Sequence, residues 1–178
     1  MLTFEKYYFN TNQSVNQIIQ TLDASDLRLL NLLQQDATLS NQALAEAAHV
    51  SPATCHRRLR RLRDEGWIEA QVAIVSADKV REALGAGLQA LMEVTLEVQT
   101  EEAMARFEHQ AVLDDAVQQC WRVSPGPDFM LVAAVADMGG YQALALRLFT
   151  MTLGVRNVRT FFAIKRAKFG TALPLPKA

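Results

Sequence analysis

The spacing of apolar residues changes partway along this chain of 178 residues. Between residues 23 and 66 they recur at helical intervals, as in Leu27, Leu30 and Leu33, which predicts helices with one buried face. Over residues 92–98 they alternate with polar residues, which is the period of a half-buried strand. A chain of this length is long enough for two small domains. The change of period therefore predicts an α+β protein whose first part is helical and whose second part is mixed.

Helix start and stop signals divide the first part into three helices. Asp23, Ser40 and Ser51 are each suited to cap a helix, and Ser51 is followed by a proline at the first helical position, where no donor is lost. Gly66 is the residue expected just past the end of the third helix. Residues 67–75 are typical of one or two short strands. Three helices and a small β element predict a winged helix-turn-helix domain.

The second part alternates strands and helices in the order β-α-β-β-α-β, which is that of a ferredoxin-like sandwich. Thr100 and Asp137 are suited to cap its two helices, the second with an apolar face that extends to Met151. Residues 129–136 are apolar throughout, which indicates a central strand. The four strands are expected near residues 92–98, 117–123, 129–136 and 155–164.

One face of this predicted sheet has no helix to cover it. Residues 129–136 are nevertheless apolar on both faces, and the neighbours Phe161 and Phe162 point in opposite directions. A large exposed apolar face is unusual on a monomer, so we expect a second copy to cover it in a two-fold dimer. Alternatively, the first domain or residues 1–20 cover it.

Residues 1–20 are either a loosely ordered extension or an arm that packs on a partner subunit through Phe4, Tyr7, Tyr8 and Phe9.

The third predicted helix carries five arginines within seven positions. On a helical wheel its buried stripe consists of Cys55, Leu59 and Leu62, and the centre of its exposed face contains Arg57 and Arg60. A guanidinium-rich face fits the major groove of double-stranded DNA, because arginine pairs bidentately with guanine edges and also binds phosphates. The alternative is an ordinary solvated helix face. Residues at the start of a recognition helix enter the groove deepest. We therefore expect base contacts from Ala53, Thr54, His56 and Arg57, and phosphate contacts from Ser51, Thr54, Arg58, Arg61 and Arg63.

The net charge of −1 gives no sign of a nucleic-acid partner. Residues 21–75 hold six basic and seven acidic residues, so binding would depend on a local field rather than on the whole domain. The acidic residues outside the third helix should then lie away from its exposed face; they include Asp23, Asp26, Asp36 and Glu46.

Over residues 21–169 the sequence resembles the Lrp/AsnC (feast/famine) family of transcriptional regulators. The specific part of the resemblance is Leu22-Asp23-x-x-Asp26, then Leu39-Ser40-Asn41-x-x-Leu44-Ala45, then Val50-Ser51-Pro52-x-x-Cys55-x-x-Arg58-Leu59-Arg60-Arg61-Leu62. The resemblance implies a homodimer, often assembled further into octamers, that binds promoter or operator DNA. It also implies a small amino-acid effector bound by the C-terminal domain, at an interface between dimers.

The stretch that matches the family's effector loop is Val123 to Leu131. By this resemblance the candidate effector-binding residues are Ser124, Gly126, Asp128 and, on the last strand, Thr160. The sequence departs from the family pattern, because Pro125 occupies the usual glycine place and Pro127 removes a backbone donor. The effector site is therefore either altered or lost, and Asp128 is either a ligand for an ammonium group or only a turn-forming residue.

The expected organisation has five parts. They are an N-terminal extension (1–20), a helix-turn-helix DNA-binding domain (21–75), a linker with a helical turn (76–86), a ligand-sensing and oligomerisation domain (87–169) and a tail (170–178).

Catalysis has little support in the sequence. His49, His56 and His109 are scattered, with no metal-ligand spacing, and no phosphate-binding glycine loop is present. Cys55 and Cys120 are expected to be core thiols. We therefore expect no enzyme activity, no metal and no cofactor. Two alternatives remain, a sirohaem-decarboxylase-like enzyme on the same architecture and an amino-acid sensor that binds no DNA.

The sequence also predicts where the protein is found. It has two cysteines, no signal-peptide pattern and no long apolar run, which predicts a cytoplasmic protein with no membrane partner.

Overall fold

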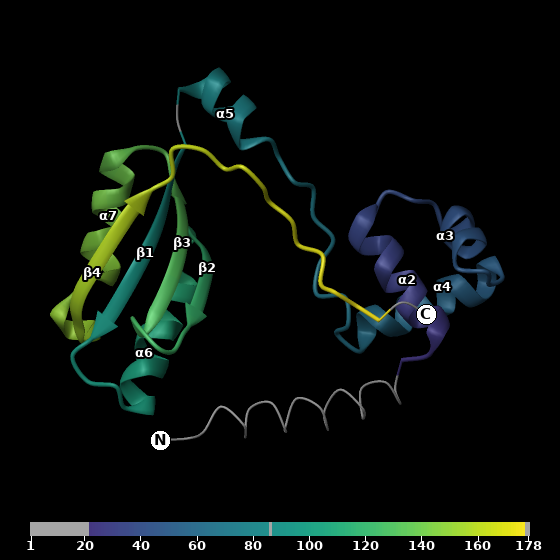
Figure 1. Ribbon diagram of the computed structural model, residues 1–178, viewed down its shortest axis with the longest axis horizontal. Coiled ribbons are helices and arrows are strands. Elements are labelled where there is room, and N and C mark those ends of the chain that lie inside the picture. Colours follow the sequence, from purple (N-terminus) through teal and green to yellow (C-terminus); the bar gives the residue numbers. More distant parts are fainter. Residues whose placement is uncertain (1–21, 86, 177–178) are drawn as a thin grey trace. The chain divides into compact units, whose positions relative to one another are not determined.

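The structure, a computed structural model, describes residues 22–85 and 87–176 (Figure 1). The chain forms two compact units. The described part of unit 1 is residues 22–73 together with residues 169–176, and unit 2 is Ile74–Lys168 apart from residue 86. The proposed arm with Phe4, Tyr7, Tyr8 and Phe9 lies outside the described residues.

Unit 1 contains the three predicted helices, α2 (Ala24–Gln35), α3 (Asn41–Ala47) and α4 (Pro52–Asp64). Each begins at the predicted cap: the side chains of Asp23, Ser40 and Ser51 accept hydrogen bonds from backbone amides of the first turn. Gly66 has a φ of 77° two residues past α4, a left-handed conformation that favours glycine. The helices enclose a core whose buried members include Leu29, Leu44, Ala45, Ala48, Cys55 and Leu59.

The chain on either side of the boundary after Ala73 differs from the sequence prediction. Residues 67–75 form no strand, and Val72, Ile74 and Val75 are exposed. A strand needs a neighbour for its backbone hydrogen bonds, and the described part of unit 1 contains no other strand. The predicted helical turn of the linker is longer than expected: α5 (Ala77–Leu84) is a two-turn helix that begins at its cap Ser76.

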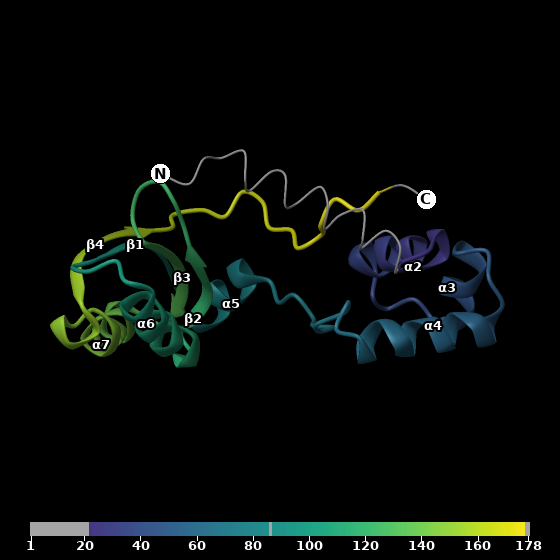
Figure 2. The same ribbon diagram turned by 90° about the horizontal axis from the view of Figure 1, so that it is seen from below.

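Unit 2 confirms the predicted order of strands and helices. Its strands are β1 (Leu88–Leu96), β2 (Val117–Arg122), β3 (Phe129–Val135) and β4 (Val155–Phe162), and its helices are α6 (Glu101–Leu113) and α7 (Met138–Leu148). The strand order is β2-β3-β1-β4, with antiparallel neighbours throughout. Both helices lie on one face of this sheet (Figure 2). Met151 does not extend the face of α7, because a short 3-10 turn (Met151–Leu153) follows and exposes that side chain.

The two faces of the sheet have different surroundings. Beneath the helices, Phe107 and Phe129 are fully buried with ring centroids 4.8 Å apart. On this side Phe162 meets Tyr141 edge-on, whereas its neighbour Phe161 lies exposed on the opposite face. That opposite face is the apolar surface that the sequence predicts. Among the described residues, no helix combines the length and apolar character needed to cross a bilayer.

Candidate nucleic-acid interface

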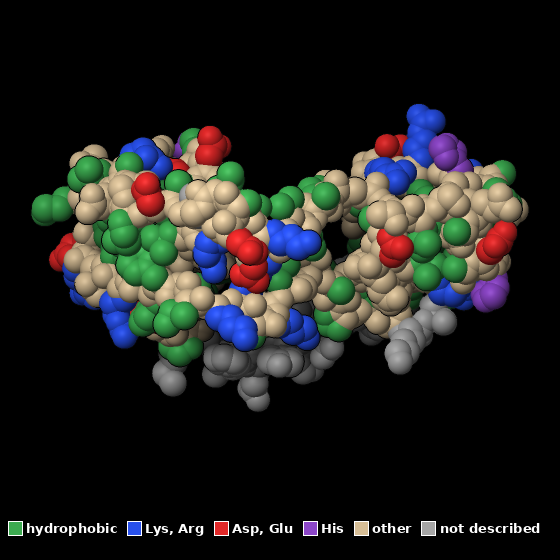
Figure 3. Space-filling view, turned by 90° about the horizontal axis from the view of Figure 1, so that it is seen from above, with side chains coloured by type: hydrophobic (Ala, Val, Ile, Leu, Met, Phe, Trp, Pro, Cys, Tyr) green, Lys and Arg blue, Asp and Glu red, His purple; other side chains and the backbone are tan. Residues whose placement is uncertain are grey.

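Helix α4 has one buried and one exposed face, as the helical wheel predicts. Cys55, Leu59 and Leu62 are buried, whereas the opposite face is exposed. In Figure 2 α4 forms the lower side of the three-helix unit, with α2 and α3 above it. Figure 3 shows basic side chains and a histidine that project together from the upper edge of the lobe that holds these helices. The exposed predicted site residues are Ser51, Ala53, His56, Arg57, Arg60 and Arg63, with Thr54 half-buried.

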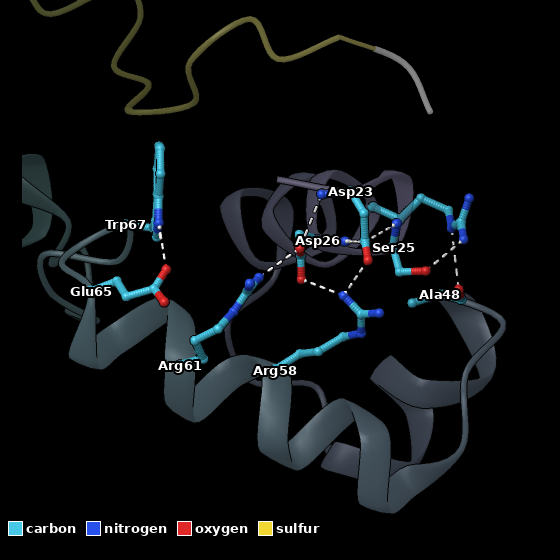
Figure 4. Close-up of polar contacts among 9 residues, drawn as sticks. Asp23, Ser25, Asp26, Ala48, Arg58, Arg61, Glu65 and Trp67 are labelled. Carbon is cyan, nitrogen blue, oxygen red and sulfur yellow. Dashed lines mark hydrogen bonds and ion pairs between the residues drawn. The ribbon is translucent and has the colours of Figure 1, made fainter. Parts of the chain in front are cut away.

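A buried carboxylate fixes α4 to α2 (Figure 4). The side chain of Asp26 is 1% exposed. Its Oδ1 accepts a hydrogen bond from Arg58 Nη1 at 2.9 Å, and its Oδ2 accepts one from Arg61 Nη2 at 2.6 Å. The same Oδ2 accepts a bond from the backbone amide of Asp23 at 3.1 Å, which completes a capping box. A buried charge requires such partners, so Asp26 depends on both arginines.

Asp23 extends this network toward solvent. Its Oδ2 accepts a 2.6 Å hydrogen bond from Arg58, and its Oδ1 accepts bonds from the amides of Ser25 and Asp26. Desolvation raises the pKa of Asp23, but the amide of Asp26 and the guanidinium of Arg58 outweigh it, so the pKa lies below its ordinary value. The hydrogen bond to Asp26 in turn raises the pKa of Arg58. Both groups are therefore held in their charged forms.

This network gives two arginines an environment that the sequence does not predict. The sequence predicts phosphate contacts for Arg58 and Arg61, but their guanidinium groups bond to Asp26, and the side chains are 20% and 36% exposed. They lie at the border of α4, where the helix meets α2. The sequence predicts that Asp23 and Asp26 lie away from the exposed face of α4; they lie at its α2-facing border, where the N-terminus of α2 supplies their carboxylates to Arg58 and Arg61.

The other three arginines have few constraints. Arg60 faces Asp64 one turn later with an Nε–Oδ2 distance of 3.7 Å, and both side chains are well exposed. Arg63 donates to Gln71 Oε1 at 3.1 Å. No hydrogen bond or ion pair joins Arg57 to any residue that the structure describes. Exposed ion pairs of this kind are weak, so these guanidinium groups can exchange their partners for a phosphate or a base.

The start of α4 is fixed by hydroxyl and amide groups. Ser51 Oγ accepts from the amide of Thr54 at 3.2 Å and donates to Thr54 Oγ1 at 2.8 Å. Asn41 Nδ2 donates to the carbonyl oxygen of Pro52 at 2.9 Å and so links α3 to α4. Sequence reasoning does not identify Asn41 as a site residue, because nothing local distinguishes it from other polar residues in the first turn of a helix.

The candidate effector residues do not form one cluster. Asp128 is 7% exposed, and its Oδ2 accepts from the amide of Leu96 at 2.7 Å. Its backbone also bonds to Val94 and Val123, so Asp128 attaches the loop to the end of β1. Ser124 and Gly126 lie exposed in this loop.

Thr160 lies elsewhere in unit 2. Its Oγ1 is 2.7 Å from the hydroxyl of Tyr141 on α7. Among the described residues, no hydrogen bond joins Thr160 to the loop of Ser124, Gly126 and Asp128.

A helix-turn-helix unit with an exposed arginine face, joined to a βαββαβ unit, defines a class of two-domain transcriptional regulators. Residues 22–69 match the family described as winged helix-turn-helix DNA-binding, and residues 89–173 match the Lrp/AsnC ligand binding domain. The chain belongs to the Lrp/AsnC family of transcriptional regulators.

Individual relatives agree with this membership. The chain is 36% identical over 154 residues to the DNA-binding transcriptional activator DecR of Escherichia coli K12. The aligned region covers 86% of this chain and 99% of that protein. It is 32% identical over 147 residues to the leucine-responsive regulatory protein of Rhizobium meliloti, covering 83% and 92% of the two chains.

Solved structures give the same result. A transcriptional regulator of Neisseria meningitidis in complex with L-Met superposes with a TM-score of 0.72 at 29% identity, covering 86% of this chain and 96% of that one. An AsnC family regulator of Agrobacterium tumefaciens gives a TM-score of 0.73 at 27% identity, with 86% and 97% covered.

Proposed function

We propose that this protein is a sequence-specific DNA-binding transcriptional regulator that reads promoter or operator DNA with the exposed face of α4. One observation carries the proposal. Asp26 binds the two inner arginines of α4, Arg58 and Arg61, whereas the outer arginines Arg57, Arg60 and Arg63 remain exposed. A recognition helix needs both features, since a helix held rigidly can present its outer side chains to base edges in a fixed register.

The roles along α4 follow from position. Ala53, Thr54, His56 and Arg57 lie in the first two turns and are the candidates for base contacts, of which Arg57 offers the bidentate donor pair that matches guanine. Ser51 at the helix cap and Arg60 and Arg63 farther along are the candidates for phosphate contacts. Arg58 and Arg61 are assigned to orientation of the helix through Asp26.

The double variant Arg57→Ala with Arg60→Ala tests the recognition face. Loss of the base contact of Arg57, worth about 1–3 kcal/mol, together with the phosphate contact of Arg60 predicts a loss of DNA affinity of about 30-fold, measured by fluorescence anisotropy on DNA from the protein's own promoter. The matched control is Arg106→Ala, an exposed arginine of α6 in unit 2, which should bind like wild type. Unchanged affinity in the double variant would show that α4 does not read DNA.

We also propose that a second copy covers the open face of the sheet. Leu91 of β1 is paired in register with Val132 of β3 and Phe161 of β4, so these side chains share a row across that face. Beside this row, Arg159 forms a 3.1 Å ion pair with Glu93. A two-fold dimer buries the row and gives two recognition helices for one duplex, and further association into an assembly such as an octamer is the finer form of the proposal. Sedimentation at micromolar concentration tests it, and a monomer contradicts it.

For the effector we propose a small amino acid bound by unit 2 at the loop of Ser124, Gly126 and Asp128, with Thr160 on β4 as a separate candidate for a contact to it. The match to a ligand binding domain supports a small-molecule effector, and the similar Neisseria regulator is a complex with L-Met. Calorimetric screening of the twenty amino acids tests the proposal. Asp128→Asn is the informative variant, because the amide oxygen can still accept from the amide of Leu96 while the charge for an ammonium group is lost. Binding that is equally tight in Asp128→Asn removes Asp128 from the site.

A further inference from the structure

Residues 169–176 leave unit 2 after β4 and belong to unit 1. Figures 1 and 2 both show the end of this segment beside α2. The chain therefore connects the two units twice, once after Ala73 and once before Phe169. The second connection ends in contacts with the helices of unit 1.

The side chain of Gln34 on α2 holds the backbone of this segment. Its Oε1 accepts from the amide of Leu173 at 2.6 Å, and its Nε2 donates to the carbonyl oxygen of the same residue at 3.3 Å. One amide side chain thus pairs both backbone groups of Leu173, as a neighbouring strand does. One turn earlier on α2, Asn31 Nδ2 lies 3.5 Å from the carbonyl oxygen of Pro176.

The side chain of Leu175 completes a hydrophobic cluster. This residue packs against Leu22, Leu30 and Leu62, together with the half-buried Leu27, Trp67 and Ile68. Leu62 lies in the last turn of α4, and Trp67 lies three residues past the end of that helix. Leu173, two residues earlier, is 68% exposed, and its contribution to the contact is its paired backbone rather than its side chain.

The composition of the segment suits this docked state. Pro174 and Pro176 fix their φ angles and have no amide to satisfy, which lowers the entropy lost when an extended peptide is bound. The two leucines that alternate with these prolines make different contacts. Leu173 contributes its backbone groups, which pair with Gln34, and Leu175 contributes its side chain, which packs in the hydrophobic cluster.

We propose that the surface formed by Asn31, Gln34 and the Leu22–Leu30–Leu62 cluster is a docking site for the Leu173–Pro176 segment of the same chain. The docked segment holds the C-terminal end of α4 against α2. Because it is continuous with β4, its withdrawal loosens α4 directly, and this provides a route from unit 2 to the recognition helix; only this last consequence rests on the proposed function.

Hydrogen exchange in the full-length chain tests the docking without DNA. The reporters are the amides of Glu65 and Ile68, which donate to the carbonyls of Arg61 and Leu62 at the end of α4. Leu175→Ala and Gln34→Ala should each speed exchange at these amides by about five-fold, the effect expected for a half-buried leucine and for a paired amide.

Two matched controls lie beside these residues. Leu173→Ala removes an exposed side chain and keeps the backbone that Gln34 holds, and Gln35→Ala removes an exposed neighbour on α2. Both should exchange within about two-fold of wild type. If Leu175→Ala and Gln34→Ala exchange like these controls, the segment does not dock.

A truncated chain that ends at Lys168 provides a second measurement. In a Trp121→Phe background Trp67 is the one remaining tryptophan, since the sequence has two. Truncation should shift the emission of Trp67 to longer wavelength, and a synthetic peptide of residues 169–178 should reverse this shift. The Leu175→Ala peptide should need an about five-fold higher concentration to reverse it to the same extent. Equal potency of the two peptides contradicts the assignment of Leu175.

The DNA affinity of the same variants separates this inference from the proposed function. Faster exchange together with weaker DNA binding supports both the docking and the route to α4. Faster exchange with unchanged DNA affinity keeps the docking and rejects the route. If wild type binds no DNA, the proposed function fails, and the exchange data alone still decide the docking.

Discussion

The inner and outer arginines of α4 are the same residue type in one short run, yet their surroundings are opposite. Arg58 and Arg61 lie against α2 and bond to a carboxylate that is 1% exposed. Arg57 and Arg60 lie one residue away in sequence, on the solvent side. A rotation of about 100° per residue is enough to move a guanidinium from a structural to a binding environment. A run of basic residues therefore divides by helical position into groups with different functions.

The largest effect should come from Asp26→Ala, which removes the partner of both inner arginines. Loss of one side of a buried ion pair costs about 3–5 kcal/mol, and because Arg58 and Arg61 can still reach water we expect about 3 kcal/mol. Chemical denaturation followed through unit 1 measures this loss. Asp64→Ala, which removes an exposed carboxylate of α4 itself, is the control and should change stability by less than about 0.5 kcal/mol. If the two variants lose the same unfolding free energy, the buried ion pairs of Asp26 stabilise the fold no more than an exposed one does.

Arg58→Ala and Arg57→Ala compare the two groups directly. Arg58→Ala removes charge-assisted hydrogen bonds to Asp23 and Asp26 and should destabilise the protein by about 1.5–3 kcal/mol, whereas Arg57→Ala should stay within about 0.5 kcal/mol of wild type. For DNA affinity at a temperature where both variants are folded, the order should reverse. Arg57→Ala should weaken binding about ten-fold, and a larger loss in Arg58→Ala would contradict the division of roles.

The smallest effect concerns acid stability. Because the folded-state pKa of Asp23 lies below its ordinary value, the charged carboxylate stabilises the fold above the ordinary carboxyl range. This contribution is lost as pH falls through the folded-state pKa, below about pH 4. In Asp23→Asn the stability of unit 1 should therefore fall less steeply between about pH 5 and 3 than in wild type, as measured by thermal unfolding at several pH values. If stability falls with pH equally steeply in Asp23→Asn and in wild type, Asp23 does not contribute to the loss of stability in acid.

Much of the fold is predictable because its signals are local. The caps Asp23, Ser40 and Ser51 each act on amides within three residues, and the buried stripe of α4 follows from its period. The apolar run that forms β3 indicates a central strand without any knowledge of its neighbours. The predicted strands at residues 67–75 fail because a strand depends on a partner, and no sequence signal states whether one is present.

The sequence by itself determined the order of helices and strands, the two faces of α4 and the open apolar face of the sheet, since all three follow from local period and capping. Only the tertiary structure decided which arginines are bound by Asp26, that Asp128 attaches its loop to β1, and that Leu175 packs beneath the end of α4. These contacts join residues that are 32 or more positions apart, from Asp26 to Arg58 and from Gln34 to Leu173. The physical reason is that chain folding, rather than any local preference, brings such residues within hydrogen-bonding distance.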